Sequence, residues 1–111
     1  MPSPSSNYNA TKGMIAAQKP IYAKYDGELI KRTLCPHVLG YKKENSNEND
    51  EKEERVLCYQ VDGPAPAQGW RYFNVIDLVL VPPHPTTGWN GPGYSKWQNG
   101  VQKPKHYVPY P

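Results

Sequence analysis

Proline and glycine restrict the folds open to this chain more than any other feature of its sequence. Thirteen prolines and nine glycines occur among 111 residues. Proline removes a backbone donor and glycine loses the most conformational entropy on ordering, so both disfavour long helices. The apolar residues gather between positions 21 and 81, and a chain of this length forms one domain. The sequence therefore predicts one small domain of short strands and turns.

Five short strands are predicted within the apolar region. Each is rich in apolar, aromatic or β-branched residues and is bounded by turn-forming residues. The predicted strands are residues 20–25, 29–41, 56–61, 70–75 and 78–81.

Local features add detail to this pattern. Asp26 and Gly27 are typical of a tight hairpin turn. Pro36 cannot donate to a strand ladder, so the second strand needs an edge position or a bulge there. Residues 56–61 carry apolar side chains on both faces, as strands of small closed barrels do. With a short helix at residues 10–19, we expect an all-β fold, a five-stranded small β-barrel whose closure hides the sheet edges.

The chain is predicted to divide into a disordered N-terminus (residues 1–9), the barrel domain (10–81) and an extended tail rich in proline and aromatic residues (82–111). Within the domain, residues 42–54 are predicted to form a mobile acidic loop. Six of the ten acids lie in residues 44–54, and outside that run twelve Lys and Arg stand against four acids, a balance of +8. We interpret the run as a solvated loop. The alternative is that it competes with an anionic ligand for the basic surface.

The sequence favours a soluble, cytoplasmic protein that does not enter a membrane. Its first residues lack a basic start followed by an apolar stretch. The densest apolar segment, residues 75–81, is too short to span a bilayer and contains Asp77. Cys35 and Cys58 lie in predicted strands without metal-type spacing, so we expect both to be reduced.

Residue patterns typical of catalysis or cofactor binding are not found in the sequence. There is no glycine-rich phosphate loop, and no nucleophile stands near a His and acid pair at a recognisable spacing. His84 and His106 lie in the tail, away from His37, so no metal site is predicted. We expect no enzymatic activity and no cofactor.

Three stretches carry a resemblance to a known family: residues 32–41 (RTLCPHVLGY), 56–63 (VLCYQVDG) and 69–75 (GWRYFNV). In order and spacing they resemble a WYL-type domain of the short, stand-alone kind. The resemblance implies an Sm-like small barrel that serves as a regulatory module sensing nucleotides or single-stranded nucleic acid. Val56, Leu57 and Cys58 occupy the place of the tripeptide that names the family. Asn74 and Asp77 stand where many members carry arginine.

The predicted ligand-binding residues include three with polar or charged side chains, Arg32, His37 and Arg71. In the family's arrangement, Arg32 and Arg71 approach one barrel mouth, where two guanidinium groups could hold a phosphate or carboxylate. The alternative is that each arginine pairs with a local acid or lies along the barrel wall. His37 could donate to a ligand, or it could be a structural histidine bonded to the backbone.

Two aromatic residues, Tyr59 and Tyr72, complete the predicted ligand site. On an exposed face their rings would stack bases. Strand alternation places Trp70 and Tyr72 on the opposite face from Arg71 and Phe73. We expect Trp70 to serve the core or a partner.

The tail is predicted to dock, because flexible linkers are poor in aromatic residues. Its candidate partner-binding residues are Trp89, Tyr94 and Trp97, and docking on the domain or on a partner both remain open. The leading functional hypothesis is a non-enzymatic sensor or binding module for an anionic ligand, either a nucleotide or single-stranded nucleic acid. The alternative is a protein-interaction adaptor or accessory subunit that uses the tail for docking.

Overall fold

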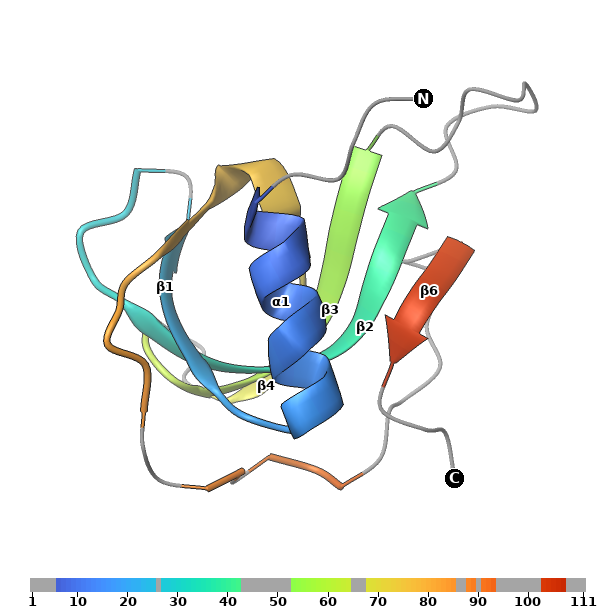
Figure 1. Cartoon of the computed structure of the whole chain (residues 1–111). Coiled ribbons are helices and arrows are strands. Elements are labelled where there is room, and N and C mark those ends of the chain that lie inside the picture. The colour runs from blue at the N-terminus through green and yellow to red at the C-terminus, as the bar shows by residue number, and fades with distance from the viewer. Residues whose placement is uncertain are drawn as a thin grey trace.

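The described part of the chain combines an antiparallel sheet with one helix at its N-terminal end (Figure 1). The computed structural model describes residues 6–25, 27–42, 53–64, 68–85, 88–89, 91–93 and 103–107. Its elements are α1 (Ser6–Ala17), β1 (Ile21–Tyr25), β2 (Arg32–Lys42), β3 (Glu53–Asp62), β4 (Gly69–Asn74), the 3-10 helix η1 (Val75–Asp77), β5 (Leu78–Leu80) and β6 (Lys103–Tyr107). Among these residues, no helix is long and apolar enough to cross a membrane.

The strands are ordered β4-β3-β2-β1-β5, and β6 pairs with β2. β2 is central: it pairs with β3 on one edge, and with β1 and then β6 along the other. All five predicted strands are therefore confirmed, in a mainly β fold. The predicted closed barrel is wrong. The sheet curls (Figure 1), but η1 leads the chain from β4 at one end to a three-residue β5 that pairs with β1 at the other, and the two end strands do not pair.

The helix buries one face, formed by Tyr8, Thr11 and Ile15, whose spacing is that of a helical stripe. It ends where Gln18 adopts a positive φ of 49° and the Lys19 amide donates to the carbonyl of Met14 at 3.0 Å, a turn typical of helix C-termini. The helix begins at Ser6, so residues 6–9, which were predicted to be disordered, belong to it.

The second strand begins at Arg32, later than predicted, because a turn intervenes. Gly27 has a φ of 79°, and the Glu28 amide donates to the Tyr25 carbonyl at 3.0 Å. Leu29 and Ile30 follow in the loop, with 89% and 64% of their surface exposed. Their apolar character therefore does not mark a strand.

The predicted irregularity at Pro36 is confirmed as a bulge. Pro36 pairs with Cys58 and Val38 with the adjacent Leu57, so His37 is the extra residue on β2. A bulge changes the direction of a side chain relative to its strand. At the far end of this hairpin, β3 begins at Glu53; residues 43–52 of the predicted acidic loop lie outside the described residues.

The described parts of the tail dock on the sheet. The Tyr22 amide donates to Nδ1 of His84 in the tail at 3.1 Å, next to the bond from the Val81 amide to the Tyr22 carbonyl at 2.8 Å that ends the domain. Further on, β6 extends the sheet, pairing Val38 with Tyr107. Tyr94 and Trp97, two of the predicted partner contacts, lie outside the described residues.

The core lies between α1 and the side of the sheet that faces it, which we call the inner face. Asn7 ties α1 to the end of the sheet, because its Nδ2 donates to the Leu78 carbonyl at 2.6 Å. No disulfide joins Cys35 and Cys58, as predicted, and both side chains are fully buried. The main core cluster comprises Tyr8, Ile15, Ile21, Ala23, Leu34, Leu39, Val56, Cys58, Phe73, Val75 and Leu78.

Candidate functional site: the aromatic face of the sheet

The predicted ligand residues on β3 and β4 lie on two different faces of the sheet. Tyr59 pairs with Trp70 across the two strands, whereas Arg71 pairs with Cys58. Residues directly opposite each other share a face, and successive residues alternate. Arg71 therefore lies on the inner face with Phe73, and Trp70 and Tyr72 lie on the outer face, as the alternation predicted.

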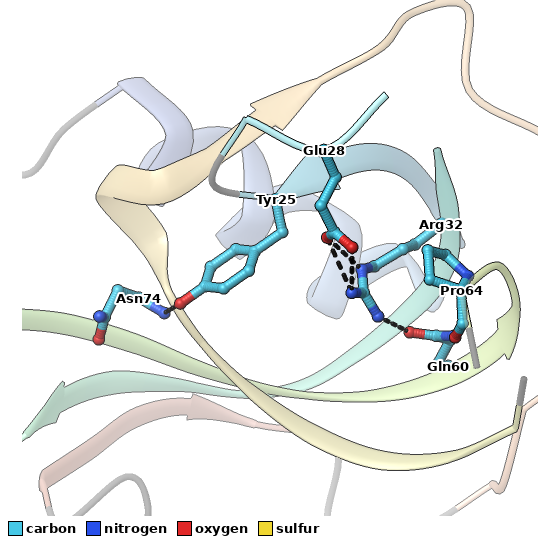
Figure 2. A network of polar contacts seen from close by, with 6 residues as sticks. All are labelled: Tyr25, Glu28, Arg32, Gln60, Pro64 and Asn74. Atoms are coloured by element: carbon cyan, nitrogen blue, oxygen red, sulfur yellow. Dashed lines mark hydrogen bonds and ion pairs between the residues drawn. The ribbon is translucent and has the colours of Figure 1, made fainter. Parts of the chain in front are cut away.

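Arg32 is held entirely by neighbouring groups of the chain (Figure 2). It is 8% exposed, and its Nη2 donates to both carboxylate oxygens of Glu28, at 2.8 and 2.9 Å. Its Nε donates to the same carboxylate at 3.1 Å, and its Nη1 donates to Gln60 Oε1 at 2.5 Å. The guanidinium also lies 5.4 Å from the centroid of the Phe73 ring. Arg32 therefore pairs with a nearby acid, which was the alternative to a ligand-binding role.

The contacts of Arg32 extend to the turn that follows β3. Gln60 Nε2 donates to the Pro64 carbonyl at 2.9 Å (Figure 2). Gly63 has a φ of 135°, and a Cβ at this position would come within 3.0 Å of Arg32 Cα. Arg32 thus supports the end of β3 that carries Tyr59. Arg71 lies on the same inner face as Gln60. Gln60 pairs with Gly69, and Arg71 follows Gly69 by two residues along β4.

His37 connects the bulge of β2 to the tail. It is fully buried; its Nδ1 lies 2.8 Å from the Cys35 carbonyl oxygen and its Nε2 lies 2.9 Å from that of Pro92. Trp89 Nε1 donates to the same Pro92 carbonyl at 2.8 Å. Burial lowers the pKa of His37 below its ordinary value, and the hydrogen bonds with the two carbonyls act in the opposite direction. His37 therefore adopts the predicted alternative, a structural histidine bonded to the backbone.

The tail meets β2 closely at this point. A Cβ on Gly91 would lie 3.0 Å from both Cβ and Sγ of Cys35, so only glycine fits without a shift. The His37 ring lies between two indoles, with its centroid 4.7 Å from that of Trp70 and 4.8 Å from that of Trp89. Trp89, a predicted partner contact, thus packs within the chain itself.

The outer surface of the sheet carries a group of rings that we call the aromatic face: Tyr59, Trp70, Tyr72 and Tyr107. Tyr59 and Trp70 meet edge to face, with ring centroids 5.4 Å apart and an interplanar angle of 80°. The register aligns Tyr107, Val38, Leu57 and Tyr72 in one row across β6, β2, β3 and β4. Val38 and Leu57 form a small buried cluster beneath Trp70 and Tyr72. Tyr107 is 48% exposed.

Tyr107 is the member of this face that sequence reasoning missed. Its segment, KPKHY, holds no aliphatic residue and contains a proline, which is tolerated only on an edge strand or at a bulge. β6 is such an edge strand, and its pairing with β2 shifts register beside Pro104. The available signal was the aromatic and basic character of the segment.

Within the described residues, no group of three or more His, Cys, Asp or Glu side chains could hold a metal ion. No family model, curated protein or solved structure matches the chain. The resemblance to WYL-type domains therefore stays a prediction.

Proposed function

We propose that the chain is a non-enzymatic binding module whose aromatic face binds the unpaired bases of a nucleotide or of single-stranded nucleic acid. The observation that carries the proposal is the presence of Tyr59, Trp70, Tyr72 and Tyr107 on one face of the sheet. Tyr107 is exposed and the other three rings are half-buried; aromatic rings on such a surface can stack on bases, each contact contributing roughly 1–3 kcal/mol. The face opposite α1 is thus the working surface.

Charge supports an anionic ligand. Outside residues 44–54, the chain carries twelve Lys and Arg against four acids, and a basic surface attracts phosphates in a salt-dependent way. The proposal assigns base stacking to the aromatic face and gives Arg32 a supporting role, since its donors already serve Glu28 and Gln60.

The proposal keeps the WYL-type, Sm-like character of the module but not the closed barrel. A helix ahead of β1, five consecutive antiparallel strands and the short η1 turn before β5 support it. Two buried cysteines that form no disulfide support a reducing, cytoplasmic location.

The test is binding of a dye-labelled oligothymidylate, followed by fluorescence anisotropy at low and moderate salt. Replacing Tyr59 and Tyr72 together by leucine keeps apolar bulk but removes the rings. We expect affinity to fall about tenfold or more, as the loss of one or two stacking contacts implies. Ile76→Ser, at a site that is 83% exposed on η1, is the control and should bind as the unchanged protein does. Equal affinity of the double variant and the unchanged protein would reject the proposal.

A second candidate is the protein-interaction adaptor, and one contact favours it. Trp89 and Pro92 of the tail pack around His37 beside Trp70, and this contact supports the idea that a Trp- and Pro-containing segment is suited to docking. The adaptor hypothesis predicts that Tyr94→Ala with Trp97→Ala abolishes capture of a partner without lowering thermal stability. Oligonucleotide binding that survives this double substitution would separate the two functions.

A further inference from the structure

Asn74 lies on the outer surface of the sheet, next to the aromatic face. It pairs with Arg55, and in the neighbouring row of the register Tyr72 pairs with Leu57. Residues two apart on a strand share a face and are about 7 Å apart. Asn74 keeps this alternation, because its backbone is extended, with a φ of −73° and a ψ of 123°. A base stacked on the Tyr72 ring would therefore bring one edge beside the Asn74 side chain.

Asn74 stands at a position where an asparagine usually stabilises the chain itself. It is the N-cap residue of η1, and the side chain of such a residue commonly accepts a hydrogen bond from the helix backbone. Among the described residues, the Asn74 side chain makes no such capping bond. Its Oδ1 is buried and accepts no hydrogen bond from any described residue. A buried acceptor without a donor destabilises the folded state, so this atom is suited to accept a donor from a bound molecule.

The backbone of Asn74 is held in place, while its side chain can turn. Its amide donates to the hydroxyl oxygen of Tyr25 at 3.4 Å, and its carboxamide points away from that tyrosine (Figure 2). The terminal torsion of an asparagine side chain has broad energy minima. Turning the carboxamide toward solvent breaks no hydrogen bond between Oδ1 and the described residues. Because Asn74 is half-buried rather than fully covered, its carboxamide can reach a ligand on the outer surface.

We propose that Asn74 makes the aromatic face selective for adenine, an inference that rests on the proposed function. Because the unused atom is an acceptor, the ligand must supply an N–H group. Adenine supplies one from its N6 amino group and presents the acceptor N7 beside it. An asparagine carboxamide matches this pair, with Oδ1 as acceptor and Nδ2 as donor. Adenine stacks on Tyr72, and the hydrogen bonds of Asn74 distinguish it from bases that lack the amino group.

The test compares two dye-labelled strands of equal length: oligodeoxyadenylate, and the same strand with unsubstituted purine in place of every adenine. Fluorescence anisotropy measures the affinity of the full chain for each strand. We expect the adenine strand to bind about threefold to tenfold more tightly, the effect of one hydrogen bond. Asn74→Leu removes the carboxamide and keeps a similar shape, so it should bind both strands equally. Thr33→Val, which removes a hydroxyl from the residue paired with Tyr22, is the control and should keep the preference.

The outcomes separate this inference from the proposed function. If neither strand bound, the proposed function would fail and the adenine preference with it. If the unchanged protein bound both strands equally, base stacking would stand and the role of Asn74 would be overturned. A preference that persisted in Asn74→Leu would overturn it as well.

Thermal unfolding of the free protein tests whether Oδ1 serves the fold instead. Asn74→Leu replaces an acceptor that has no donor among the described residues by an apolar group of similar shape, a change that is neutral or stabilising. We therefore expect an unfolding midpoint equal to or above that of the unchanged protein. A clearly lower midpoint would reveal a hydrogen bond within the chain and would contradict the proposal.

Discussion

Glu28 binds Arg32 through both carboxylate oxygens, at 2.8 and 2.9 Å from Nη2, across the loop that joins β1 to β2. The same guanidinium donates to Gln60, which in turn donates to the carbonyl of Pro64 (Figure 2). One arginine thus joins the β1–β2 loop to the end of β3. The residue that resembled a ligand contact stabilises the hairpin that presents Tyr59.

Glu28→Gln should destabilise the fold, because it removes the counter-charge of a guanidinium that is only 8% exposed. The Glu28 side chain keeps 32% of its surface in solvent, so we expect a modest loss of unfolding free energy, about 1–2 kcal/mol. Urea unfolding measures it. Asp77→Asn removes an acid elsewhere and serves as the control; equal unfolding midpoints for the two variants would show that the ion pair contributes nothing.

Gly91→Ala should loosen the tail from β2. The new methyl would lie 3.0 Å from both Cβ and Sγ of Cys35, and such overpacking costs about 1–3 kcal/mol. Gly93→Ala is the matched control, since nothing lies within 4 Å of its Cβ. Thermal unfolding compares the two variants. If Gly93→Ala were the more destabilising variant, the close packing of the tail at Gly91 against Cys35 would be contradicted.

Acidification should weaken the fold through its three histidines. Burial is the first cause that lowers the pKa of His37, His84 and His106 alike. The folded chain then binds protons less readily than the unfolded chain, so stability is full above the ordinary histidine pKa of about 6.5 and falls as pH drops below it. His84 illustrates how protonation can destabilise the folded state. Its Nδ1 accepts a hydrogen bond from the Tyr22 amide, and a protonated Nδ1 can no longer accept it.

Unfolding midpoints measured between about pH 7.5 and about pH 5.5 check this direction, in a window above the ordinary carboxylate pKa values. His84→Asn keeps an acceptor but cannot titrate, so its stability should depend less on pH than that of the unchanged protein. A fold that becomes more stable on acidification would contradict all three assignments.

Sequence patterns predicted the features that depend on neighbouring residues. Pro36 required an edge position or a bulge, and alternation separated Trp70 from Arg71, because both predictions follow from the chemistry and spacing of one strand. Pairing of Arg32 with a nearby acid was one of the two predictions, but its bond to Gln60 was not predictable in this way, since Gln60 lies 28 residues away. β6 was missed for a similar reason. Lys103–Tyr107 has weak strand character, and it pairs only because β1 leaves part of the β2 edge free.

Substitution of Tyr107 should change ligand affinity while leaving the stability of the fold nearly unchanged. Its ring extends the row through Val38 to Tyr72, yet it is 48% exposed and lies on an edge strand. Tyr107→Thr keeps strand propensity and removes the ring, so oligothymidylate affinity should fall about fivefold or more, the loss of roughly 1 kcal/mol of stacking. The unfolding free energy should change by no more than about 0.5 kcal/mol, as for other exposed positions. Val79→Thr, at an exposed position on β5, is the control. Unchanged affinity in Tyr107→Thr would mean that the binding surface ends at β4 and that β6 only closes the edge of β2.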